Sequence, residues 1–228
     1  MGRTRKELPV LKPLFSAIAT AMLVTATIAP AHAQTTAAAS SAAATTGAAP
    51  DALVRQISTD VINSVKSDKA IQAGDIGRII GLVDTKVMPS VNFEVVTRSA
   101  VGPKWREATP EQRTKLQSEF KTLLVRVYAG ALTQIRDQAV EITKTLPVPG
   151  GSQVVVQSEV RGKGEPIKLD YRLDKFAEAW KIIDVNVGGI WLVQSYRSQF
   201  AQVLGGTGGI DALITRLVEQ NKTAGAKS

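Results

Sequence analysis

Apolar residues recur every three or four positions over the part of the chain that begins at Pro50-Asp51. This spacing predicts a first helix that runs to about Lys66, because side chains at i, i+3, i+4 and i+7 share one helical face. Asp75 is placed to cap a second helix, and a third is predicted over about residues 86–100. These segments predict an N-terminal helical lobe.

A longer helix is predicted to begin at Thr109. Thr at the N-cap, Pro110 at the first helical position and Glu111 in the first turn all favour a helix start. The apolar pattern extends this helix to about Gln138. Its stripe is too broad for a surface helix on a thin core, so we expect it to cover a sheet. The stripe consists of Leu116, Phe120, Leu123, Leu124, Val127, Tyr128, Ala131, Leu132 and Ile135.

Four runs rich in Val, Ile and aromatic residues follow, separated by connectors of hairpin length. Short loops between consecutive strands predict an antiparallel meander. In the last run, alternation places Trp180 and Ile182 on one face and Ile183, Val185 and Val187 on the other. The predicted strands are Val140–Leu146, Gln153–Arg161, Ile167–Leu173 and Ala179–Val187.

Gly188-Gly189 predicts a tight corner, and helical spacing returns from Leu192 onward. Residues 205–209 predict a loop, after which Asp211 is placed to cap a final helix. This order of elements predicts an α+β fold in which helices wrap an antiparallel sheet. We expect one domain over residues 51–222, with a helical part at about 51–138, the sheet at about 140–187 and closing helices at about 190–221.

The first 33 residues have the pattern of a secretory signal peptide. A basic start precedes an apolar stretch over Leu14–Ala29 and the small-x-small sequence Ala31-His32-Ala33. Residues 34–50, rich in Ala, Ser and Thr, predict a disordered leader. We therefore expect an exported, periplasmic protein, which without any Cys must fold without disulfides.

Composition excludes several kinds of chemistry. The 28 Lys and Arg residues are scattered rather than clustered, which argues against nucleic-acid binding. His32 is the only His and leaves with the signal peptide, so the exported chain would contain neither His nor Cys. This rules out Ser-His-Asp and Cys-His nucleophile systems and zinc sites built from Cys and His. We expect no catalytic residues, no metal and no cofactor, with a hydrolase as a disfavoured alternative.

One stretch carries a family resemblance through the residues Trp180, Lys181, Asp184, Val185, Gly189, Leu192, Val193, Tyr196, Arg197, Gln199 and Phe200. It resembles the closing segment of the MlaC (toluene-tolerance Ttg2) family of periplasmic phospholipid carriers. The segments 89–93 and 102–105 are similar to two further motifs of that family. The chain departs from the family pattern at Asn92, Ile183, Trp191 and Ser195.

The resemblance implies an NTF2-like roll with an extra helical lobe. It implies a soluble carrier that shuttles phospholipid between the outer and inner membranes and maintains outer-membrane lipid asymmetry. The implied partners are phospholipid, an inner-membrane ABC transporter with its membrane-anchored substrate-binding ring, and an outer-membrane lipoprotein–porin complex. We expect an apolar acyl-chain pocket between the sheet and the long helix. The residues expected to line or gate it are Phe120, Leu124, Tyr128, Leu169, Tyr171, Trp180, Ile182, Trp191, Leu192, Tyr196 and Phe200.

Two alternatives to a phospholipid carrier remain open. One is a carrier of another apolar ligand, such as a hopanoid or an organic solvent. The departure from the family pattern at Trp191, at the glycine corner, supports this alternative. The other is a non-catalytic periplasmic interaction module with a filled core. Arg197 has two interpretations as well: it contacts a lipid phosphate through paired hydrogen bonds, or it makes a structural contact to a carboxylate or helix end.

Overall fold

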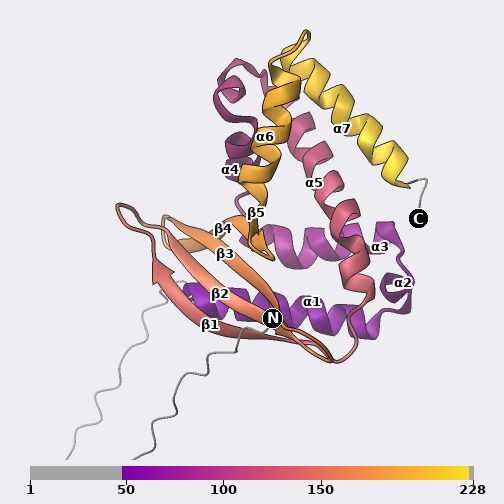
Figure 1. Cartoon of the computed structure of the whole chain (residues 1–228), viewed down its shortest axis with the longest axis vertical. Coiled ribbons are helices and arrows are strands. Elements are labelled where there is room, and N and C mark those ends of the chain that lie inside the picture. Colours follow the sequence, from indigo (N-terminus) through magenta and orange to yellow (C-terminus); the bar gives the residue numbers. More distant parts are fainter. Residues whose placement is uncertain (1–47, 226–228) are drawn as a thin grey trace, which may run out of the picture. The chain divides into compact units, whose positions relative to one another are not determined.

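The computed structural model describes residues 48–225, so the predicted signal peptide and most of the predicted leader lie outside the described residues. The colours of Figure 1 show that a group of helices precedes the sheet along the chain and that a helical pair follows it. Over this range no helix combines the length and apolar character that a membrane crossing requires. The elements are α1 (Pro50–Ser67), α2 (Lys69–Gln72), α3 (Ile76–Leu82), η1 (Val83–Val87), η2 (Met88–Ser90), α4 (Phe93–Val101), η3 (Gly102–Glu107), α5 (Pro110–Thr133), β1 (Ala139–Pro147), β2 (Val154–Arg161), β3 (Ile167–Phe176), β4 (Ala179–Val187), β5 (Ile190–Trp191), α6 (Leu192–Leu204) and α7 (Gly209–Gly225).

The sheet has five strands in the order β1-β2-β3-β4-β5, and every neighbouring pair is antiparallel. The predicted α+β class and antiparallel meander are therefore confirmed. Strand β4 has the predicted bounds, whereas β3 continues to Phe176. The glycine corner leads first into the short strand β5, which was not predicted, and then into helix α6.

Helix α1, not the long helix α5, packs on the sheet (Figure 1). Val54 and Ile57 of α1 are buried together with Val156, Leu173 and Ile182 of three strands, and we call this group the sheet cluster. Helix α5 packs instead against α7, α3 and α4. The expectation that α5 covers the sheet is wrong, because its apolar stripe is divided among these helices.

A β-bulge in β4 changes which residues of the strand share a face. Ile182 and Asp184 pair with consecutive residues of β3, so Ile183 is an extra residue without a partner. Because this residue resets the alternation, Ile182 and Val185 both pack in the sheet cluster, whereas Ile183 and Asp184 line the opposite face. The predicted pattern, which put Val185 on the same face as Ile183, is therefore wrong.

The third predicted helix, over residues 86–100, is interrupted. Val91 forms a parallel bridge with Ile182, and the Asn92 N–H donates to the Ile182 carbonyl at 3.0 Å. The Asn92 side chain then accepts from the Val95 N–H at 3.2 Å and caps α4. Pairing with β4 uses backbone groups that a continuous helix would need, so the chain passes through η1 and η2 before α4 begins.

The long helix α5 ends at Thr133 rather than at about Gln138. The Arg136 guanidinium donates to the carbonyls of Thr133 and Ile135, both at 2.8 Å, and so satisfies acceptors at the helix end. Its start is as predicted: Thr109 forms a capping box at the N-terminus. The chain then turns into β1.

The start of the final helix also differs from the prediction. Helix α7 begins at Gly209, so Asp211 lies in its first turn and is not its N-cap. The Asp211 carboxylate instead accepts from Nε2 of Gln112 at 2.7 Å, which links α7 to the first turn of α5.

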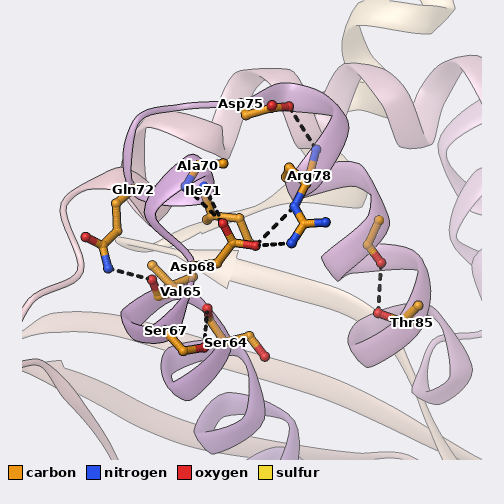
Figure 2. Close-up of polar contacts among 11 residues, drawn as sticks. Ser64, Val65, Ser67, Asp68, Ala70, Ile71, Gln72, Asp75, Arg78 and Thr85 are labelled. Carbon is orange, nitrogen blue, oxygen red and sulfur yellow. Dashed lines mark hydrogen bonds and ion pairs between the residues drawn. The ribbon is translucent and has the colours of Figure 1, made fainter.

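Figure 2 shows one carboxylate at the junction of α1, α2 and α3. Asp68 caps the unpredicted helix α2 by accepting from the N–H groups of Ala70 and Ile71 at 2.9 and 3.2 Å. It also pairs with the Arg78 guanidinium at 2.6 Å. The hydrogen bonds from Arg78 and these N–H groups hold the pKa of Asp68 below its ordinary value. Asp75 caps α3 by accepting from the Arg78 N–H, which confirms that prediction.

Candidate functional site

The helices enclose an aromatic cluster centred on Phe120 of α5. Its ring centroid lies 4.9 Å from that of Tyr196 and 5.1 Å from that of Phe200, both edge-on, and 5.8 Å from that of Phe93. Edge-to-face packing at these distances is favourable. We call the buried apolar residues of α4, η3, α5, α6 and α7 around it the helical cluster. Only 1% of Phe120 is exposed, so protein atoms already surround this side chain.

Part of the apolar stripe of α5 remains uncovered. Leu124, Val127 and Tyr128 stand at i, i+3 and i+4 and so share one face of the helix. Val127 is 53% exposed, and the other two are half-buried. Burial, and to a smaller extent the neighbouring Tyr128, raises the pKa of Tyr196 to about 12. This face of α5 is therefore apolar and bordered by neutral phenol groups.

The sheet cluster contributes a second apolar surface. Tyr171 and Trp180 are partly buried against it. Burial raises the pKa of Tyr171 to about 12, against a smaller lowering by its hydrogen bond with Ser58. Val91 packs against both the sheet cluster and the helical cluster, so the apolar interior is continuous between the sheet and the helices.

The structure divides the predicted pocket residues into groups. The eight that belong to or pack against the two clusters are Phe120, Leu124, Leu192, Tyr196 and Phe200 in the helical cluster and Tyr171, Trp180 and Ile182 in the sheet cluster. Tyr128 neighbours Tyr196, and Leu169 is half-buried on β3 opposite Val187. Trp191 belongs to neither cluster and lines a cavity on the face of the sheet opposite the sheet cluster. That these residues bind lipid stays a prediction.

A cavity of about 600 Å³ lies on that other face, between β3, β4 and the helices α4 and α6. Its lining includes Trp191, and the guanidinium carbon of Arg172 lies 4.4 Å from the centroid of the Trp191 ring system. Arg98 of α4 and Arg197 of α6 line the same cavity. Sequence reasoning missed Arg98 and Arg172. The one signal for Arg172 is its alternation with the apolar residues Tyr171 and Leu173, which places it on the polar face of the third predicted strand.

Asp184 is buried at the wall of this cavity, with 7% of the residue exposed. Its Oδ1 accepts from the N–H groups of Val185 and Val193, at 2.8 and 3.0 Å. Burial raises the pKa of Asp184, although these hydrogen bonds and the Arg172 charge act in the opposite direction. A raised carboxyl pKa is a property of general acids. Here, however, the carboxylate stabilises the start of α6, because the N-cap residue Trp191 supplies no side-chain cap.

Within residues 48–225 no three His, Cys, Asp or Glu side chains gather where they could hold a metal ion. The chain's single His, His32, lies outside the described range.

Comparisons with known proteins agree with one another. The sequence model of the MlaC protein family matches residues 55–219. The toluene tolerance protein ttg2D of Pseudomonas putida is 24% identical over 156 residues, which cover 68% of this chain and 73% of the relative. The intermembrane phospholipid transport system binding protein MlaC of Haemophilus influenzae is 23% identical over 173 residues, which cover 74% of this chain and 80% of the relative.

A solved structure is similar over nearly its whole length. The phospholipid-binding protein from Ralstonia solanacearum, in complex with a phospholipid at 1.53 Å resolution, is 38% identical and has a TM-score of 0.75. The match covers 78% of this chain and 99% of that chain. The family match spans far more than half of the sequence, and the fold agrees with that of the solved structure. The chain therefore belongs to the MlaC protein family.

Proposed function

We propose that this chain is a periplasmic phospholipid carrier, which binds lipid and transports it between membranes without catalysing a reaction. The observation that carries the proposal is the likeness to the R. solanacearum protein, whose structure contains a bound phospholipid and is matched over 99% of its length. The H. influenzae relative, named as a binding protein of intermembrane phospholipid transport, supports the same function.

The physical task of such a carrier is to keep acyl chains out of water. Burial contributes ~0.8 kcal/mol per methylene, so exposing one chain of about 14 methylenes costs about 11 kcal/mol. An apolar surface that encloses the chain meets this requirement, and no nucleophile, general base or metal is needed. The continuous apolar interior between the sheet cluster and the helical cluster has the required character.

We infer that the acyl chains lie against the uncovered face of α5. Leu124, Val127 and Tyr128 present apolar surface that the protein itself leaves partly or largely exposed. Tyr171, half-buried on β3, adds apolar and phenolic surface from the sheet cluster. Phe120 and Phe200 are enclosed by other rings, and we assign them to the support of this surface rather than to lipid contact.

The proposal extends to the cellular setting. The chain would be exported by its first 33 residues and would exchange lipid with an inner-membrane ABC transporter, through its membrane-anchored substrate-binding ring, and with an outer-membrane lipoprotein–porin complex. The support is the signal-peptide pattern of the sequence and the name of the H. influenzae relative, which places that protein in a transport system.

The test is to express the chain from Gln34, purify it without detergent, and measure bound lipid by native and then denaturing mass spectrometry. We expect about one phospholipid per protein. Leu124→Trp and Leu169→Trp should each fill apolar space and reduce the bound lipid while the thermal unfolding transition is retained. Ser118→Trp, at an exposed position of α5, adds the same side chain outside the proposed site and should leave lipid content unchanged.

Other outcomes would contradict the proposal. A different apolar molecule in the spectrum, such as a hopanoid, would replace phospholipid as the cargo. A protein that is free of ligand and takes up no lipid from vesicles would instead be a non-catalytic interaction module. If the two leucine variants and the Ser118 variant bound equal amounts of lipid, the assignment of the pocket residues would be wrong, but the proposal that the protein carries phospholipid would stand.

A further inference from the structure

Three arginines line the cavity on the sheet face that lies away from α1: Arg98, Arg172 and Arg197. Among the described residues, none of their guanidinium groups forms a salt bridge or donates a side-chain hydrogen bond within the normal distance limits. Nε of Arg172 is moreover buried and has no hydrogen-bond partner in that range. A buried donor without a partner is destabilising, so this arrangement favours an acceptor supplied from outside the chain.

Two other arginines of the fold are paired with carboxylates. Arg161, on β2, contacts Glu141 at 2.9 Å and Glu159 at 2.8 Å. Arg78 contacts Asp68 at 2.6 Å. The three arginines of the cavity, by contrast, form no salt bridge among the described residues.

The two carboxylates at the cavity wall are already engaged. Oδ1 of Asp184 accepts from the N–H groups of Val185 and Val193, and the nearby Arg172 charge acts to lower the pKa of this carboxyl. Asp174 accepts from Gln153 at 3.2 Å and from the Lys175 N–H at 2.8 Å. Three arginines and two aspartates therefore line the cavity, which leaves an excess of one positive charge and several free N–H donors.

We propose that this cavity binds the phosphate group of a phosphodiester. A guanidinium presents paired N–H donors that match two phosphate oxygens, and a phosphodiester carries the single negative charge that balances the excess. Val95, Ile183 and Val193 supply apolar wall for the carbon atoms next to the phosphate. The cavity lies on the face of the sheet opposite the sheet cluster, and its lining includes none of the residues assigned above to the acyl chains, so the two sites can be tested separately.

The phosphodiester has two possible sources, which the test must separate. One is a small water-soluble glycerophosphodiester, and the other is the head group of a phospholipid. We use glycerophosphoglycerol as the probe for the first and dihexanoyl-phosphatidylglycerol, below its micelle concentration, for the second. Both carry one phosphodiester charge, and only the second has acyl chains.

The readout is the indole N–H signal of Trp191 in a two-dimensional NMR spectrum of the protein from Gln34. The chain has three tryptophans, and Trp191→Phe identifies the signal by its loss. We expect a saturable shift with the phosphodiester probes. Arg172→Gln and the exposed Arg98→Gln should each weaken the apparent affinity by about tenfold or more. Arg161→Gln, which removes an arginine of the same sheet outside the cavity, should leave the affinity unchanged.

The comparison of probes and variants decides the proposal. A similar affinity for both probes would show that the cavity recognises the phosphodiester itself. A response to the lipid probe alone would show that the cavity binds a phospholipid head group only when the acyl chains are bound as well. A Leu124→Trp variant that loses lipid but keeps the Trp191 response shows that the two sites are separate. The proposal would be overturned if the Trp191 signal showed no saturable shift, or shifted equally with sodium chloride at the same ionic strength. It would also be overturned if Arg161→Gln weakened the affinity as much as the cavity variants, or if the signal responded only to an acidic peptide.

Discussion

The Asp184 carboxylate accepts a hydrogen bond from the Val193 N–H at 3.0 Å, so a residue of strand β4 caps helix α6 from outside the helix. The two residues are nine positions apart, separated by the glycine corner and β5. Because the side chain of Trp191 at the N-cap position contains no hydrogen-bond acceptor oxygen, the start of α6 depends on the sheet for this contact.

Removal of this cap should destabilise the fold. We expect Asp184→Ala to lower the free energy of unfolding by about 1–3 kcal/mol, since a partly buried N–H at the start of α6 loses its acceptor. Asp184→Asn keeps an oxygen at the same position and should retain most of that stability. Urea unfolding of both variants at one pH measures the difference. An equal loss in the two variants would show that the charge, rather than the cap, matters.

The pH dependence of stability should also reflect Asp184. Burial raises its pKa in the folded protein above the unfolded value, so the folded state binds the proton more tightly. The stability that this group contributes is fully present below the unfolded pKa and is lost as the pH rises through the raised folded pKa. Relative to Asp184→Asn, the parent protein should therefore lose stability from about pH 3 to neutral pH. Urea unfolding at a series of pH values provides the comparison, and parallel curves would contradict it.

The contribution of Asp68 to stability should change with pH in the opposite direction to that of Asp184. The hydrogen bond from Arg78 is the largest of the effects that lower its pKa. Its contribution to stability is present above the unfolded pKa and is lost as the pH falls through the lowered folded value. Arg78→Gln should raise the pKa of Asp68 toward its ordinary value, as followed by the carboxyl carbon shift in an NMR titration. Arg55→Gln is the control, because Arg55 lies on α1 and has no ion pair among the described residues. It should leave the pKa of Asp68 unchanged.

Phe120 should behave as a core residue. We expect Phe120→Ala to lower the free energy of unfolding by about 3–5 kcal/mol, because the rings of Tyr196 and Phe200 would be left facing a void. Val127→Ala, at an exposed position of the same helix, should change it by no more than about 0.5 kcal/mol in the lipid-free protein. Chemical denaturation of delipidated protein tests both, and a small effect at Phe120 would mean that the cluster refills the space.

Local pattern was sufficient for most element boundaries and insufficient for their packing. The bounds of β4 were predictable because turn residues flank an uninterrupted run of β-favouring side chains. The bulge at Ile183 was not, since it exists only in the pairing with β3. The break near Val91 likewise depends on a bridge to Ile182, which is distant in sequence.

The candidate site was predictable in residue type rather than in arrangement. An apolar stripe on α5 shows that the helix has apolar neighbours, but it does not specify whether these are strands or other helices. Phe120 and Trp191 were therefore grouped together, although one is enclosed among helices and the other stacks with Arg172 in a charged cavity. The cavity itself combines residues of α4, β3 and α6, which no single segment of sequence reveals.

The contact between the segment around Val91 and strand β4 limits how this protein can open. The Val91 bridge, the Asn92 hydrogen bond and the bond from Lys181 to the Pro89 carbonyl at 2.6 Å all join the same short stretches. Moving α4 away from the sheet would break these contacts together. A lipid chain should therefore be admitted by displacement of α5, for which residues 48–225 show no comparable backbone link to a strand. The Asn92 amide would then stay protected from hydrogen exchange while lipid enters and leaves, which makes the α4–β4 junction the fixed side of a hinge.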